Sequence, residues 1–380
     1  MSQRGSSDRR RVDIVFADAG SGHRTAASGL ANALRAIRPA WRVEPVNLVD
    51  LLGAQPRLAS HVSAGLQRFS RLLREDRIRY LEALGTALAS ASLRSRMRPD
   101  ALRAFWQSDS PDAVVSVIPF FNPPVYGAAR LANPAVRCVT IPVEPIETTR
   151  DYWLTPATDQ EYLLATDALW AAARKRGIPG DRMHRIGGMI IEPCFYDPPA
   201  LNAAEARAAL GLAPDLPTVL VHFGQQGSEV AKAVDDVLAN GGVRVNAIFL
   251  AARQRELYEH LRSHNTHYPK AVRQFEPDPP VRYLAMADAL IGKSAGMTMT
   301  EALVAGRPVI AMRSRSYAPT WWANEAWIER TGIGAVVRRV AELPEALRRV
   351  LGDVRCRTNA ARHAHRAVFE AADYLARLLA

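Results

Sequence analysis

The feature that most constrains the fold is a buried strand that runs into a small-residue loop and then into an amphipathic helix. Residues 12–16 (Val-Asp-Ile-Val-Phe) are a short apolar run, and the glycine-containing loop 17–23 follows them. Apolar residues then recur at helical spacing over 27–37, before Pro39. This order predicts part of a parallel sheet, because parallel strands are joined by crossover connections that are usually helical.

The same unit returns in the second half of the chain. An apolar run at 218–223 leads into a loop at 224–228 and a helical pattern at 229–238. Between the halves, residues 187–202 are rich in glycine and proline, which is typical of an interdomain linker. Further strand-like runs lie at 43–48, 113–118, 136–143, 184–186, 245–250, 272–275, 289–291 and 308–312.

These runs predict an α/β protein made of two doubly wound, Rossmann-like domains that face each other across a cleft. The N-terminal domain would span residues 1–186 and the C-terminal domain residues 187–354. One long helix is predicted over 355–379, in a C-terminal segment (355–380) that packs back near the N-terminal domain. Ligands of such sheets bind beyond the carboxyl ends of the strands, so the loops that follow strands are the candidate sites.

Length and composition fit such a protein and exclude several other classes. The 380 residues are 48% hydrophobic and 23% charged, which argues against a disordered, collagen-like or coiled-coil chain. The longest apolar run, at 113–121, is far shorter than the roughly 20 residues of a membrane span. No signal peptide is evident and the three cysteines lie far apart, so we expect a cytoplasmic protein.

The chain is strongly basic, with a formal net charge of +11. Only four of its 49 lysines and arginines are lysines. A basic surplus favours an anionic partner, which would be a nucleic acid, an anionic lipid surface or a phosphorylated substrate. Because no nucleic-acid-binding motif is recognisable, we expect no nucleic-acid partner.

Much of this charge gathers in residues 51–98. Nine arginines lie between Arg57 and Arg98, against three acidic residues. Apolar side chains interleave them at helical spacing, namely Leu66, Phe69, Leu72 and Leu73. One interpretation is an interfacial helix on anionic lipid, at the inner face of the cytoplasmic membrane. The other is an ordinary solvated helix face.

A second candidate site follows the strand that ends at Ile291. Small residues lead from Lys293 into a helix, and the free N–H groups of a helix start bind anions such as phosphate. Glu301 lies one turn into this helix, where its carboxylate can accept the two hydroxyls of a ribose. Alternatively, Thr298 and Glu301 form a capping box in which Glu301 only satisfies a backbone N–H group.

The loops after the other two strands carry further polar residues. In the first, Asp18 to Arg24, His23 begins a helix whose N-terminus would keep the imidazole neutral and able to act as a general base. The alternative is a glycine turn with an incidental histidine. In the other, 224–228, backbone amides and glutamines can bind a diphosphate or a sugar, and a simple tight turn is the alternative.

These three loops, in this order, resemble those of the inverting nucleotide-sugar glycosyltransferases. That family includes monogalactosyldiacylglycerol synthase, the processive diacylglycerol glucosyltransferases and the peptidoglycan N-acetylglucosaminyltransferase. The loop from Asp18 to Arg24 is similar to the family's Asp-Thr-Gly-Gly-Gly-His-Arg, and Lys293, Thr298 and Glu301 match its second signature. The resemblance covers about 12–334 and implies the two-domain GT-B fold, with the acceptor bound by the first domain and the donor by the second.

The resemblance also implies roles for individual residues. His23 or Asp18 would be the base that deprotonates the acceptor hydroxyl. The candidate donor-binding residues are Gly224, Gln225, Gln226, Gly227, Ser228, Phe275, Glu276, Ser294, Gly296, Met297, Thr298, Glu301, Asn324 and Glu325. The candidate acceptor-binding residues are Gly20, Gly22, Arg24 and Asn122. A UDP-sugar would be the donor substrate, with no cofactor and no metal, since the metal-binding Asp-x-Asp pattern occurs nowhere in the chain.

The acceptor side departs from the family pattern. Ile118 stands where the family has a histidine, Ile141 where it has an aspartate, and Asn324 where it has a glutamine. The sequence therefore predicts a glycosyltransferase that uses a UDP-sugar, and leaves the sugar and the acceptor open, with a membrane lipid as one candidate acceptor. A soluble natural-product glycosyltransferase, a UDP-sugar epimerase and a basic surface-binding protein with a vestigial nucleotide site are the alternatives.

Overall fold

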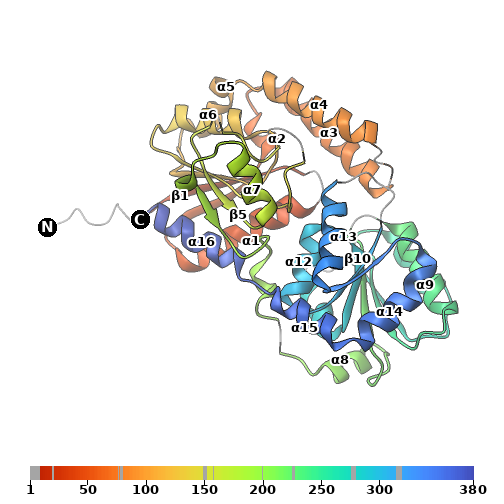
Figure 1. Ribbon diagram of the computed structural model, residues 1–380. Coiled ribbons are helices and arrows are strands. Elements are labelled where there is room, and N and C mark those ends of the chain that lie inside the picture. The colour runs from red at the N-terminus through yellow and green to blue at the C-terminus, as the bar shows by residue number, and fades with distance from the viewer. Residues whose placement is uncertain are drawn as a thin grey trace. The chain divides into compact units, whose positions relative to one another are not determined.

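The computed structural model describes residues 9–18, 21–75, 77, 80–148, 152–156, 158–198, 200–224, 227–274, 280–313 and 319–380, without the side chains of 21, 73–74, 80–87 and 319. The chain divides into two compact units (Figure 1). The first comprises Met1–Arg71, Tyr80–Pro193 and Arg366–Ala380. The second comprises Leu72–Arg79 and Cys194–His365.

The first unit holds a six-stranded parallel sheet in the order β2-β1-β3-β4-β5-β6. Its strands are β1 (Arg11–Phe16), β2 (Arg42–Asn47), β3 (Ala113–Ser116), β4 (Arg137–Thr140), β5 (Glu161–Leu164) and β6 (Met183–Arg185). The helices of this part of the chain are α1 (Ser21–Ile37), α2 (Leu48–Leu51), α3 (Pro56–Arg74), α4 (Tyr80–Arg96), α5 (Pro99–Arg103), α6 (Asn122–Ala132), α7 (Asp167–Lys175) and the C-terminal α16 (Ala367–Leu378). Helix α16 packs against α1, within the first unit.

The second unit holds another six-stranded parallel sheet, in the order β12-β11-β10-β7-β8-β9. Its strands are β7 (Thr218–His222), β8 (Asn246–Leu250), β9 (Lys270–Arg273), β10 (Ala289–Lys293), β11 (Val309–Met312) and β12 (Gly334–Val337). Its helices are α8 (Ala203–Ala209), α9 (Ser228–Asn240), α10 (Arg255–Ser263), α11 (Val281–Met286), α12 (Gly296–Val304), α13 (Pro319–Thr331), α14 (Leu343–Gly352) and α15 (Val354–Arg362).

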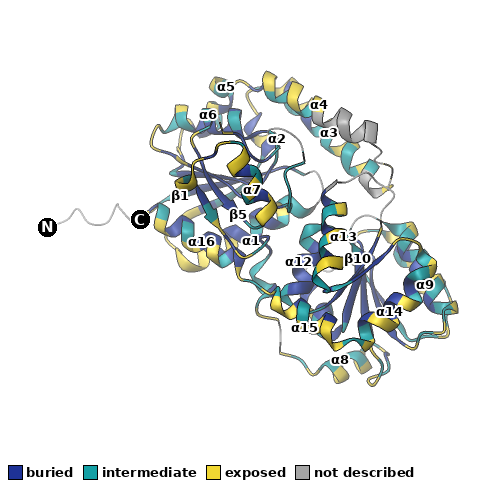
Figure 2. Cartoon of the chain, in the orientation of Figure 1, coloured by how far each residue is buried: buried dark blue, intermediate teal, exposed yellow. Residues whose placement is uncertain are grey.

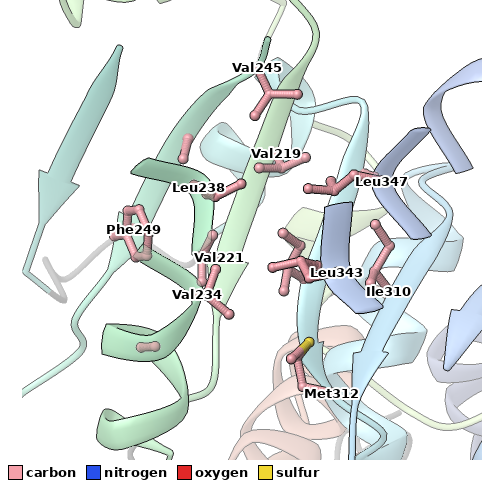
Figure 3. Close-up of a cluster of buried hydrophobic side chains, with 14 of the residues drawn as sticks. Val219, Val221, Val234, Leu238, Val245, Phe249, Ile310, Met312, Leu343 and Leu347 are labelled. Atoms are coloured by element: carbon pink, nitrogen blue, oxygen red, sulfur yellow. The ribbon is translucent and has the colours of Figure 1, made fainter. Parts of the chain in front are cut away.

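Both sheets are buried between helices, as their apolar sequences require (Figure 2). Every residue of β3, β7 and β8 is buried. In the second unit, alternate residues of β7 pack with the apolar faces of α9 and α14 (Figure 3). This core includes Val219, Val221, Val234, Leu238, Ile310, Leu343 and Leu347.

In each sheet, the order in which successive strands are added reverses beside the first strand, and this positions the candidate sites. In the first sheet β1 pairs with β2 on one side and β3 on the other. In the second, β7 pairs with β8 on one side and β10 on the other. Loops that leave such a pair run in opposite directions and open a crevice at the carboxyl ends of the strands, where ligands of doubly wound sheets bind.

The two doubly wound sheets confirm the predicted fold class, with three differences in detail. The apolar pattern misses β5, because it begins with the charged Glu161, and β12, because it is only four residues long and begins with Gly334. The predicted single helix over 355–379 is wrong, since α15 and α16 are separate helices. The main segment of the second compact unit, Cys194–His365, starts a few residues after the predicted start at 187.

Candidate functional site

The first candidate site lies at the carboxyl ends of the neighbouring strands β1 and β3, and His23 is at its centre. His23 is in the first turn of α1, and its Nδ1 lies 2.6 Å from the carbonyl oxygen of Val117, which follows β3. A carbonyl can only accept, so Nδ1 carries the proton and Nε2 carries the free lone pair. Burial lowers the pKa of His23, and the Val117 carbonyl and the charge of Asp18 oppose this in part. The imidazole is therefore neutral at pH 7, in the form that a general base requires.

Asp18 has partners of its own beside this histidine. Its carboxylate accepts two hydrogen bonds from the guanidinium of Arg24, one of them 2.9 Å long from Nε, and a third from Nδ2 of Asn47 at 3.0 Å. Asp18 acts on His23 through its charge, which raises the pKa of the imidazole. Because the Asp18 carboxylate is held by Arg24 and Asn47 and its charge acts on His23, the geometry allows Asp18 to stabilise a protonated His23.

Aromatic side chains adjoin His23, and none of them was predicted to belong to this site. The ring of Trp153 lies 6.1 Å from that of His23, and Tyr152 contacts both Trp153 and Phe120 edge-on. Phe120 has a φ of 69°, which is unusual for a bulky residue, and its N–H donates to the carbonyl of Tyr152 at 2.6 Å. The hydroxyl of Tyr152 donates to Glu144 at 2.8 Å, and burial raises the pKa of Glu144 to about 7. In the sequence, the adjacent Tyr152 and Trp153 were the only hint that aromatic side chains gather at this site.

Asn122 does not fit the acceptor-binding role predicted for it. Its side chain is fully buried at the start of α6. Ser116 donates to its carbonyl oxygen at 2.5 Å, and its Nδ2 donates to Thr140 Oγ1 at 3.2 Å and to the Trp153 carbonyl at 3.4 Å. Asn122 therefore ties together the loops after β3 and β4. Gly22 and Arg24, by contrast, lie in the first turn of α1 together with His23.

The second candidate site lies at the carboxyl ends of the neighbouring strands β7 and β10. Gly224 and Gly227 follow β7 with φ values of 65° and 71°, and Gly227 caps α9, so that Ser228 is the first residue of this helix. These left-handed conformations favour glycine. A side chain on Gly224 would place its Cβ 3.9 Å from Nζ of Lys293, at the end of β10. The loops of the two strands thus meet, as the strand order requires.

The turn from β10 into α12 carries the other predicted donor-binding residues. Helix α12 begins at Gly296, with Ala295 as its N-cap, so Met297 and Thr298 lie in its first turn. Thr298 is the third residue of the helix rather than its cap, which rules out the capping box with Glu301. Glu301 is buried, and its charge raises the pKa of Lys293 against the stronger effect of burial, which leaves that pKa at about 8.

Asn324 and Glu325, both on α13, are also buried near this turn. Nδ2 of Asn324 donates to the Ser294 carbonyl at 2.7 Å, which holds the turn before α12. Glu325 accepts from Nε of Arg313 at 2.8 Å. A contact of either residue with a donor sugar stays a prediction. The predicted site residues Gly20, Gln225, Gln226, Phe275 and Glu276 lie outside the described residues.

Solved structures that resemble the chain share its two-unit architecture. The glycosyltransferase SnogD from Streptomyces nogalater matches 98% of the chain with a TM-score of 0.58 at 19% identity, over all of its own length. MurG from Acinetobacter baumannii matches 97%, and 99% of its own chain, with a TM-score of 0.59 at 15% identity. A UDP-GlcNAc 2-epimerase from Neisseria meningitidis, bound to UDP-GlcNAc, matches 97%, and 99% of its own chain, with a TM-score of 0.58 at 12% identity. The fold is therefore the GT-B fold, as predicted.

In sequence, the chain is similar to plant monogalactosyldiacylglycerol synthases. It is 26% identical over 321 residues to a probable monogalactosyldiacylglycerol synthase 2 of Oryza sativa subsp. japonica, which covers 79% of the chain and 65% of the relative. It is 24% identical over 337 residues to monogalactosyldiacylglycerol synthase 3 of Arabidopsis thaliana, covering 82% and 68%. No family model matches the chain. The chain thus spans about two thirds of the length of these relatives, and the predicted resemblance to their family is confirmed.

Proposed function

We propose that this protein is a metal-independent, inverting glycosyltransferase that moves a sugar from a UDP-sugar to the hydroxyl of a membrane lipid. The observation that carries the proposal is the His23 imidazole, whose Nδ1–H is fixed by the Val117 carbonyl so that Nε2 is free to take a proton. The similarity to monogalactosyldiacylglycerol synthases supports the class of donor and of acceptor.

On the acceptor side, Nε2 of His23 takes the proton of the acceptor hydroxyl as the hydroxyl oxygen attacks the anomeric carbon of the sugar. The bond from that carbon to the β-phosphate oxygen breaks, and UDP leaves with the bonding electrons. The charge of Asp18 stabilises the imidazolium that forms, since it raises the pKa of His23. A single displacement from the face opposite the leaving group inverts the anomeric configuration.

On the donor side, negative charge develops on the leaving diphosphate and must be stabilised. The N–H groups at the start of α12 and the ammonium of Lys293, which ends β10 shortly before this helix, both provide positive charge on this side of the sheet. By its match to the family signature, Glu301 receives the ribose hydroxyls. Because these groups are fixed before the substrate binds, we propose that no metal ion is needed.

The proposal predicts that UDP raises the melting temperature of the protein in the presence of EDTA. A ligand at 100 times its Kd stabilises the fold by about 2.7 kcal/mol, a shift that scanning fluorimetry resolves. Incubation with a panel of UDP-sugars and a lipid extract should then give a product heavier by one sugar residue in mass spectrometry. A wild-type protein that ignores UDP both with and without added metal would contradict the proposal.

The same panel separates the alternatives. Interconversion of a UDP-sugar with no acceptor present would select an epimerase, a reaction suggested by the fold shared with the UDP-GlcNAc 2-epimerase. Transfer to water-soluble phenols or sugars, with none to lipid, would select a soluble natural-product glycosyltransferase.

The basic helix α3 is the candidate surface for contact with a membrane. Arg57, Arg68 and Arg71 are exposed, and their spacing of 11 and 3 residues places them on one face of the helix. Leu58 and Val62, on the opposite face, are buried. Near the end of α3, Ser70 Oγ lies 3.4 Å from the backbone oxygen of Asp18, so this helix adjoins the His23 loop.

This arrangement changes the expected mode of docking. Leu66 and Phe69 share the inward face with Leu58 and Val62 and are only half-buried. The free face of α3 is therefore the basic one, and we propose that it binds anionic head groups by charge, with little insertion of apolar side chains. Among the described helices, none is both long and apolar enough to cross a membrane.

The triple variant Arg57→Glu, Arg68→Glu, Arg71→Glu should no longer co-sediment with vesicles containing anionic lipid. Each basic residue near such a surface contributes about 1 kcal/mol, so the wild type should bind at low salt and be released at high salt. The exposed residues Arg282, Arg330 and Arg348 provide a control triple with the same change in charge. If both triples lose binding equally, net charge rather than α3 is responsible.

A further inference from the structure

Three consecutive backbone N–H groups of the first unit converge on one carboxylate. Oε1 of Glu147 accepts from the N–H of Tyr152 at 3.1 Å and from that of Leu154 at 3.3 Å. Its Oε2 accepts from the N–H of Trp153 at 2.9 Å. The side chain of Glu147 is only 5% exposed, so little water competes for these bonds. Successive N–H groups that point at one anion make a well-defined anion site, and Glu147 therefore fixes the course of residues 152–154.

A cation holds the other side of this carboxylate. Arg176, the C-cap of α7, places Nη2 3.4 Å from Oε1 of Glu147, and its Nη1 donates to the carbonyl of Leu154 at 3.3 Å. Burial raises the pKa of Glu147, whereas Arg176 and the three N–H groups lower it. Removing one partner of a buried pair is far more disruptive than removing one of an exposed pair. Glu147 is thus the central anchor of this segment.

The anchored segment carries the aromatic side chain that adjoins the proposed base. Trp153 is fully buried, and its ring lies 6.1 Å from the His23 ring at an angle of 38°, within the contact range of aromatic pairs. The carbonyl of Tyr152 accepts from the N–H of Phe120 at 2.6 Å, and the carbonyl of Trp153 accepts from Asn122 at 3.4 Å. The segment is therefore joined to the loop after β3, which also holds Nδ1 of His23.

We propose that Glu147 is a positioning residue for His23, which acts by holding residues 152–154 so that the Trp153 ring covers one side of the imidazole. His23 keeps part of its surface exposed, as a base that must meet a substrate requires, and Trp153 keeps water from the covered side. Packing and a further layer of hydrogen bonds are what keep a reacting group in its productive geometry. The kinetic part of this inference rests on the proposed function, whereas the contact of Trp153 with His23 does not.

The pKa of His23 distinguishes a positioning role from a purely electrostatic one. Among the described residues, the charged side chains beside the imidazole or beside its covering segment include Asp18, Arg24, Glu144, Glu147 and Arg176. Burial is the largest cause that lowers the pKa of His23, so release of Trp153 would raise this pKa towards its ordinary value. Loss of the negative charge of Glu147 alone would lower it. The two mechanisms therefore predict shifts of opposite sign.

Replacing Glu147 by alanine is the direct test. The pKa of His23, measured by NMR on histidine-labelled protein and assigned by the signal that His23→Asn removes, should rise in Glu147→Ala. Glu147→Gln keeps one acceptor oxygen for the segment and should give a smaller rise. Glu44→Ala is the matched control, because it removes from β2 a carboxylate that pairs with Arg35 and Arg42 instead, and it should leave the pKa unchanged.

A double variant shows whether Glu147 acts through Trp153. Trp153→Leu should raise the pKa of His23 at least as much as Glu147→Ala, and combining the two should add nothing, because residues that act through one contact are not additive. Each variant should also lower kcat at pH 7 by about 10–100-fold, the effect of a misplaced reacting group, and leave the Kd for UDP unchanged. The acidic limb of the pH profile should move upward together with the pKa measured by NMR.

The outcomes separate failure of this inference from failure of the proposed function. An unchanged or lowered pKa of His23 in folded Glu147→Ala, or additive shifts in the double variant, would overturn the inference, even if wild type transfers sugar. A wild type that transfers no sugar, with the expected rise in pKa, would overturn the proposed function alone. If Glu147→Ala does not fold, the sign of the shift in Glu147→Gln decides. If neither folds, Trp153→Leu decides, because an unchanged pKa there removes the contact through which Glu147 acts.

Discussion

Replacing His23 by asparagine is expected to lower kcat by about 10²–10⁴-fold, the contribution of a general base, and to leave the binding of UDP unchanged. Asparagine is the sharpest substitution, because its amide can still donate to the Val117 carbonyl in place of Nδ1 and keeps the start of α1 intact. What it lacks is the Nε2 lone pair. Equal melting temperatures of the variant and wild type would show that only the chemistry is lost.

The pH profile gives an independent check on His23. A base must be unprotonated, so activity should be retained at high pH and lost as pH falls through the pKa of His23. Burial places that pKa below the ordinary value of 6.5. The residual activity of His23→Asn should lack this acidic limb. Asp18→Asn should cost less than His23→Asn, and the reverse order of effects would make Asp18 the base.

The place of both candidate loops in the fold could be predicted from the sequence, because a strand that runs into a glycine loop and a helix has few ways to fold. The loops after Phe16 and Ile291 carry residues suited to acid–base chemistry and to phosphate binding. The structure places each loop where the strand order of its sheet reverses. What the sequence could not supply is the partner of His23. Val117 lies 94 residues away, and it meets His23 only because β1 pairs with β3.

Polar residues after strands were the hardest to interpret. Asn122 and His222 both follow or end a buried strand, yet one has its hydrogen bonds satisfied inside the domain and the other has an unpaired nitrogen. Sequence alone does not separate these cases, because the difference depends on which loops pack nearby. The internal hydrogen bonds of Asn122 argue against its predicted acceptor role, and nothing in the sequence indicated them; His222 was not singled out at all.

The affinity for UDP is expected to fall as pH rises above about 8, because Lys293 must be protonated to attract the diphosphate. Burial lowers the pKa of this lysine to about 8, with partial opposition from Glu301. Above that pH, the free protein has lost the proton and must take it up again to bind UDP. The dissociation constant should then rise by about tenfold per pH unit, and calorimetry between pH 7 and 9.5 measures it.

Lys293→Arg is the matched control, since a guanidinium stays protonated throughout this range. The variant should bind UDP more weakly than wild type at pH 7, because its wider head group must fit beside Gly224, where an added Cβ would lie 3.9 Å from Nζ of Lys293. Its affinity, however, should not share the fall above pH 8. Any titration of the nucleotide itself is common to both proteins, so the difference between the two curves isolates the lysine. Parallel curves would mean that Lys293 does not carry the charge that holds the diphosphate, and the proposed metal-free stabilisation of the leaving group would lose its main residue.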